Sequence, residues 1–113
     1  MKTQGQRESQ KQERQAAERF GGRRTTGSGN GWVQKNDVRT PTHSMELKYT
    51  DKKSFSLKLA DLLLAEQYAI LDGREMLFGI SMGGQVYWIL PDHGLQSLLA
   101  RQSNGDAPAD PGP

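Results

Sequence analysis

The sequence predicts a single small α/β domain with a central mixed β-sheet flanked by helices. Two observations support this fold class. Apolar residues recur at helical spacing on both sides of a strand-rich segment. In addition, the apolar runs 76–82 and 85–90 are joined by Gly83-Gly84, which is typical of a β-hairpin. The chain has 113 residues, of which 34% are hydrophobic, so it has room for one domain.

Both ends of the chain are too polar to join a core. Residues 1–13 have Met1 as their only large apolar side chain, and residues 101–113 contain two alanines and three prolines. Such segments cannot bury enough surface to offset the entropy lost on ordering. We therefore expect a disordered arm over 1–13, a domain over 14–100 and a disordered tail over 101–113.

The first part of the domain is expected to be a helix followed by a basic loop. Residues 7–20 are rich in Gln, Glu, Arg and Ala, which favour helix, and Gly21-Gly22 would end it. Residues 21–31 contain five glycines and predict a loop, and 32–39 read as a short extended segment.

The remaining elements follow from hydrophobic periodicity. Strict alternation over 44–50 predicts a half-buried strand with Glu46 and Lys48 on its polar face. Ser54 or Ser56 could cap a helix that runs to about Asp72. After the hairpin, a last short helix begins at Pro91-Asp92. Its inward-facing residues are expected to be Leu95, Leu98 and Leu99.

The charge of the chain is divided unevenly along its length. Residues 1–58 hold 13 Lys and Arg against six Asp and Glu, a net of +7, and residues 59–113 hold two against seven, a net of −5. The two halves sum to the overall +2. A basic half of this kind indicates a polyanionic partner, nucleic acid before membrane.

Several classes are excluded by composition. The chain has no cysteine, which excludes disulfides, thiolate zinc sites and a cysteine nucleophile. The first twenty residues carry no apolar stretch, and the longest apolar run, 62–65, is far shorter than a membrane span. We expect a soluble protein of a reducing or neutral compartment.

Asp37, Glu46 and Lys48 form the pattern that suggests chemistry. Glu46 and Lys48 are two residues apart and so project from one face of a strand, about 6.5–7 Å apart. If 32–39 and 44–50 pair as a hairpin, Asp37 comes near Glu46. Two close carboxylates repel each other unless a cation lies between them, and oxygen ligands suit Mg²⁺ or Mn²⁺.

With its D-x(n)-E-x-K pattern, the sequence resembles the PD-(D/E)xK nuclease superfamily. The resemblance covers about residues 14–90 and extends to archaeal-type Holliday junction resolvases and small phage endonucleases. It implies a restriction-endonuclease-like αβββαβ core. In that branch a glutamate in the first helix, here Glu18, is followed by a small-residue basic loop, here 24–29. Asn36 stands where the signature often has proline.

The resemblance implies a role for each matching residue. Asp37 and Glu46 would be metal ligands together with the Leu47 carbonyl, Lys48 the catalytic lysine and Glu18 an additional acid. The expected nucleic-acid contacts come from the basic loop, the turn after the strand and the middle of the second helix: Arg23, Arg24, Thr26, Gly27, Ser28, Lys52, Lys53 and Gln67.

Plainer interpretations of the same residues stay open. Glu46 and Lys48 could be an ion pair on a solvated strand, Glu18 a solvent-facing salt-bridge partner, and Gln67 a polar group at the edge of the core.

We expect a Mg²⁺-dependent endonuclease for branched DNA, with Mn²⁺ as a substitute metal, that acts as a homodimer in the cytoplasm of a bacterial or phage-infected cell. The alternatives are a non-catalytic nucleic-acid-binding module, or a nicking or restriction-like nuclease that cuts ordinary duplex DNA.

Overall fold

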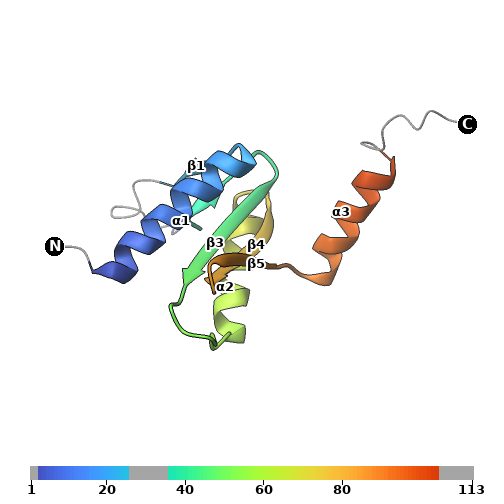
Figure 1. Cartoon of the computed structure of the whole chain (residues 1–113). Helices are drawn as coiled ribbons and strands as arrows, with labels where there is room; N and C mark the ends of the chain where they lie inside the picture. Colours follow the sequence, from blue (N-terminus) through green and yellow to red (C-terminus); the bar gives the residue numbers. More distant parts are fainter. Residues whose placement is uncertain (1–2, 26–35, 105–113) are drawn as a thin grey trace, which may run out of the picture.

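A computed structural model describes residues 3–25 and 36–104 (Figure 1). The described chain is a small α/β domain with one five-stranded mixed sheet in the order β1-β2-β3-β4-β5. Strands β3 and β4 run parallel, and the other neighbouring pairs are antiparallel. The elements in chain order are α1 (Gln4–Phe20), β1 (Arg23–Arg24), β2 (Val38–Arg39), β3 (His43–Tyr49), α2 (Leu59–Leu71), β4 (Glu75–Met82), β5 (Gln85–Ile89) and α3 (Asp92–Asn104). The predicted fold class is confirmed.

Two helices cover opposite faces of the sheet, and each has its own apolar cluster. Helix α1 packs Ala16 on one face, over Val38, Met45 and Leu47. Helix α2 packs on the other face over apolar residues of β4, of which Phe78 is fully buried. Strand β3 lies between α1 and α2, and its side chains alternate between the two faces of the sheet as predicted. Met45 and Leu47 face α1, while Glu46 and Lys48 lie on the α2 side.

Residues 4–13 are helical, in the segment where a disordered arm was expected over 1–13. Helix α1 begins at Gln4 because Thr3 and Gln6 form a capping box. The Gln6 backbone N–H donates to the Thr3 hydroxyl at 3.1 Å, and the Gln6 side chain accepts from the Thr3 N–H at 2.8 Å. The helix ends at Gly21, whose φ of 67° is the left-handed conformation that glycine adopts without strain.

Two further boundaries differ from expectation. Arg23 and Arg24 form a short strand paired with β2, where the glycine-rich segment predicted a loop. Helix α2 begins at Leu59, with Lys58 at the N-cap and no side-chain cap, so neither Ser54 nor Ser56 caps it.

The C-terminal part contains the predicted hairpin and a last helix. Gly83 and Gly84 both have positive φ, as the tight turn between β4 and β5 requires. Helix α3 extends to Asn104, past the boundary expected at residue 100. It stands apart from the rest of the domain in Figure 1. Its leucines, expected to face inward, are exposed: Leu95, Leu98 and Leu99. Among the described helices, none is long and apolar enough to cross a membrane.

Candidate active site

The β2–β3 hairpin brings Asp37, Glu46 and Lys48 together. Val38 pairs with Met45, and continuing this antiparallel register by one residue places Asp37 opposite Glu46. The two carboxyl groups lie within hydrogen-bonding reach of each other, and each shifts the pKa of the other. The Lys48 Nζ lies 3.2 Å from Glu46 Oε2. The juxtaposition predicted from the sequence is therefore present, and the three groups form one contiguous cluster on the α2 side of β3.

Hydrogen bonds on both sides of Asp37 fix its position. Its Oδ2 accepts from the Leu47 backbone N–H at 2.9 Å, and its carbonyl accepts from the Thr25 N–H at 2.8 Å. The preceding residue, Asn36, is 1% exposed, and its amide donates to Ser44 Oγ and to the Ala65 carbonyl, both at 2.9 Å. Asn36 thus ties the hairpin to α2, a role that its position in the sequence did not suggest.

Leu47 contributes through its backbone. Its side chain is buried against α1, while its N–H holds Asp37. The metal-ligand role of its carbonyl stays a prediction.

Burial and like charge raise the pKa of both carboxyl groups in the cluster. For Glu46, burial followed by the negative charge of Asp37 raises the pKa from 4.5 to about 7, against the opposing effect of Lys48. For Asp37, burial also raises the pKa, while the hydrogen bond from Leu47 lowers it. The pair therefore retains a proton near neutral pH when no cation compensates its charge.

One further acid, Glu13 on α1, senses the charge of Asp37. Burial and the charge of Asp37 both raise the pKa of Glu13, and Arg24 opposes this from 3.4 Å. Glu18, the acid expected from the sequence, is exposed on α1. It lies about 140° further round the helix from Glu13 at 100° per residue. The structure does not bring Glu18 to the site.

The sequence contained a signal for Glu13. Ala16 and Ala17 are the two alanines of this helix, and both pack in the core on the α1 side. Glu13 lies three and four residues before them, so it shares the face that α1 turns toward the sheet.

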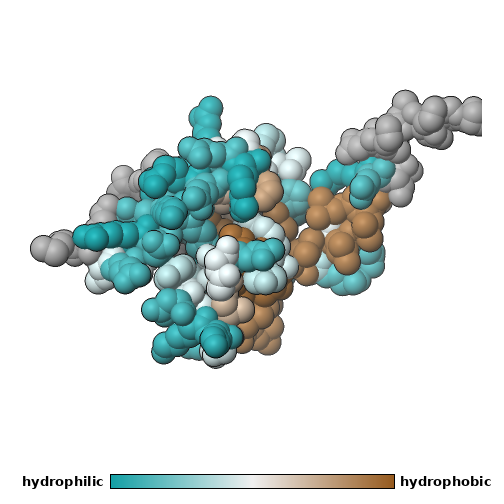
Figure 2. Space-filling model, in the orientation of Figure 1, coloured by the Kyte–Doolittle hydropathy of each residue, from teal (hydrophilic) through white to brown (hydrophobic). Residues whose placement is uncertain are grey.

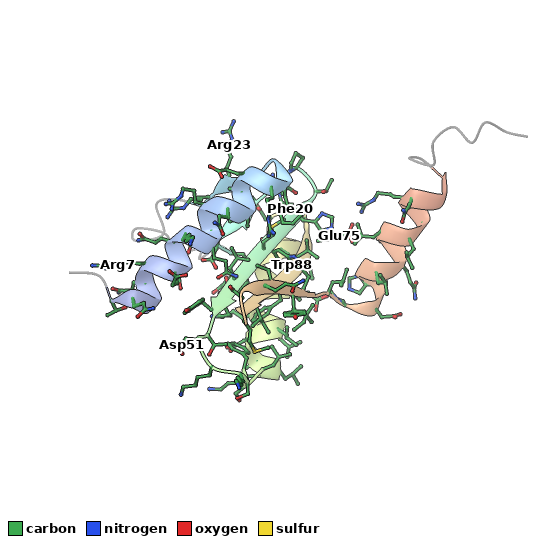
Figure 3. All side chains as sticks on the ribbon, in the orientation of Figure 1. Arg7, Phe20, Arg23, Asp51, Glu75 and Trp88 are labelled. Atoms are coloured by element: carbon green, nitrogen blue, oxygen red, sulfur yellow. The ribbon has the colours of Figure 1, made fainter. Side chains whose placement is uncertain are left out.

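The expected nucleic-acid contacts are spread over several surfaces. Arg23 is exposed and projects outward from the end of the sheet in Figure 3. Arg24 is engaged by Glu13, and Lys52 and Lys53 are exposed in the turn after β3. Gln67 points outward from α2, on the opposite side of the helix from Ala65 and Ala69, so the structure does not bring it to the site. Thr26, Gly27 and Ser28 lie outside the described residues.

The donor set at the cluster suits a hard divalent cation. Asp37 and Glu46 offer carboxylate oxygens that are already in contact, and a cation between them would replace the shared proton. Over residues 3–25 and 36–104, no group of three or more His, Asp or Glu side chains is arranged to hold a metal. Asp37 and Glu46 could therefore hold an ion as a pair, with backbone oxygen and water completing the ligands.

Comparison of the chain with family models, curated proteins and solved structures found no match. The functional argument therefore depends on the geometry of the cluster.

Proposed function

We propose that the chain is a divalent-metal-dependent DNA endonuclease with its active site at Asp37, Glu46 and Lys48. The observation that carries the proposal is the contact between two carboxyl groups of raised pKa, with a lysine ammonium 3.2 Å from one of them. Displaced pKa values in one cluster are typical of functional sites. The net +7 of residues 1–58, which include all three groups, supports a polyanionic substrate.

Asp37 and Glu46 would hold Mg²⁺, or Mn²⁺ in its place. Such an ion polarises a phosphodiester and lowers the pKa of bound water. Lys48 is positioned by Glu46 to donate a hydrogen bond to a phosphate oxygen as negative charge builds there. The water oxygen forms the new bond to phosphorus as the bond from phosphorus to the leaving sugar oxygen breaks.

We assign the proton that the water loses to Glu13, the additional acid whose pKa responds to the charge of Asp37. Its raised pKa makes it a better proton acceptor than an ordinary glutamate. The leaving oxygen takes a proton from solvent.

We further propose branched DNA as the substrate and a homodimer as the active form, since two sites could then act on two strands. Ordinary duplex DNA is the alternative substrate. The alternative to catalysis is a binding module in which the Glu46–Lys48 ion pair is structural.

The test is a cleavage assay on a four-way junction, a linear duplex and a single strand, with Mg²⁺ or EDTA. Lys48→Ala is compared with the matched control Lys58→Ala, an exposed lysine before α2. We expect Mg²⁺-dependent cleavage of the junction that falls at least about 100-fold in Lys48→Ala and is retained in Lys58→Ala.

Two other results would overturn either the catalytic activity or the preference for branched DNA. Binding to all three substrates without cleavage would leave only the binding module. Equal cleavage of junction and duplex would remove the preference for branched DNA and keep the enzyme.

A further inference from the structure

Helix α2 is apolar on its outer face as well as on the face it turns to the sheet. Ala65 and Ala69 are buried, while the opposite side of the helix carries five large aliphatic residues that are 44–68% exposed. Exposed apolar residues gathered in this way, here around the polar Gln67, mark an interaction site. The exposed residues are Leu59, Leu63, Leu64, Ile70 and Leu71.

Helix α3 carries a second uncovered apolar surface. Leu95, Leu98 and Leu99 follow the i, i+3, i+4 spacing of a single stripe and are 36–54% exposed. The helix is tethered to the body by polar pairs, Arg101 with Glu75 and His93 with Glu66.

The two surfaces face the same open space. Figure 2 shows hydrophobic surface on the α2 side of the body and on α3, with a notch between them. The last nine residues of the chain, 105–113, contain no large apolar side chain that could fill it. A second copy of the chain offers an apolar surface suited to the notch, the leucine stripe of its own α3.

We infer that this surface is a homodimer interface, in which α3 of each copy inserts between α2 and α3 of the other. A second copy supplies the amphipathic helix that the notch requires and buries its own leucine stripe in the same contact. A two-fold arrangement uses the same patch on both copies, so each uncovered surface finds its complement.

The exposed area agrees with the size of a stable dimer. The eight aliphatic residues of the patch are on average about half exposed. At about 100 Å² for a leucine side chain, they offer on the order of 400 Å² of apolar surface per copy. A standard interface buries about 800 Å² per partner, of which about 65% is apolar in homodimers. The leucine patch alone supplies most of that apolar part.

This inference deepens the proposed homodimer by naming its surface, and it does not depend on cleavage. The patch belongs to residues 59–99, in the acidic half of the chain. A dimer formed there leaves α1 and the turn at Lys52 and Lys53 accessible to a polyanion.

The first experiment measures the mass of the full chain in solution by light scattering. We expect about 25 kDa, twice the 12.6 kDa of one chain. Leu98→Glu should reduce the mass to that of one chain. Ala100→Glu, which adds the same charge about 160° away on the same helix, should leave the dimer intact. A monomeric wild type, or a Leu98→Glu variant that stays dimeric, would overturn the inference.

A second experiment decides the case if Leu98→Glu fails to fold. The chain has no cysteine, so Leu63→Cys and Leu98→Cys each introduce a single thiol. Mixing the two variants should give a crosslinked species of two chains that forms less readily from either variant alone. A variant that carries both Leu63→Cys and Leu98→Cys gives the opposing result. If it crosslinks only within one chain, α3 closes on its own α2 and the proposed dimer interface is wrong.

Discussion

At the scale of single residues, Glu46 is the most informative group. It is held between a like charge at Asp37 and an opposite charge at Lys48, and its pKa is nevertheless raised to about 7. Burial outweighs the attraction of the lysine because a half-buried carboxylate loses hydration that one ammonium does not replace. A site in this state favours a proton or a cation.

The raised pKa of Glu46 predicts a pH-dependent stability in the absence of divalent metal. The unfolded chain loses the proton near the ordinary pKa of 4.5, and the folded chain near 7. The free energy of unfolding should therefore fall as pH rises from about 4.5 to 7 and then level off, at about 1.4 kcal/mol per unit of pKa difference. Urea unfolding at a series of pH values measures it.

Glu46→Gln should remove most of this fall, because its side chain cannot ionise. Asp37, whose pKa is also raised, contributes a smaller fall of the same sign. Glu18→Gln is the control and should keep the wild-type profile. An unchanged slope in Glu46→Gln would show that another group titrates.

Glu13 and Glu18 provide a matched pair on one helix. Glu13→Gln removes a carboxylate whose pKa responds to Asp37, whereas Glu18→Gln removes an exposed one. We predict that the cleavage rate falls at least about 10-fold in Glu13→Gln and is unchanged in Glu18→Gln. Single-turnover rates on the preferred substrate measure this, and the opposite order would return the role to Glu18.

At the scale of elements, the β2–β3 hairpin determines whether a site exists. Its register places Asp37 opposite Glu46, and a shift of one residue would send Glu46 and Lys48 to the α1 side. Asn36 secures this arrangement because its buried amide joins Ser44 of β3 to the Ala65 carbonyl of α2.

Asn36→Ala should lower the free energy of unfolding by about 1–3 kcal/mol, since it leaves a buried carbonyl and hydroxyl without their donor. Gln96→Ala, which removes an exposed amide on α3, is the control and should change stability by less than about 0.5 kcal/mol. Chemical denaturation measures both. Equal effects would mean that the Asn36 hydrogen bonds contribute little.

The elements show which features sequence patterns can predict. The β4–β5 hairpin and the alternation of β3 were predictable because two-glycine turns and period-two burial are local signals. The start of α1 was missed because polar composition was taken as disorder, although the Thr3 and Gln6 capping box was present. Glu13 was missed because Glu18 was assigned from the resemblance, which places a glutamate in the first helix, and not from the apolar face of that helix.

At the scale of the whole molecule, charge and apolar surface are segregated. The basic half contains α1, the hairpin and the candidate site, and the acidic half contains α2, the β4–β5 hairpin and α3. The exposed leucines of α2 and α3 lie in the acidic half. Polyanion binding and self-association can therefore use different faces. The exposure of the α3 leucines could not be predicted from the sequence, because they have the spacing of a buried stripe.

The most direct test of the central claim is a calorimetric titration of Mn²⁺ into the protein near neutral pH, in buffers of different ionisation enthalpy. We predict saturable binding that releases protons, because the cation replaces the proton shared by Asp37 and Glu46. Both binding and proton release should be lost in Asp37→Asn and Glu46→Gln and kept in Glu18→Gln. Absence of binding in the wild type, or binding that survives both site variants, would contradict a metal site at this pair.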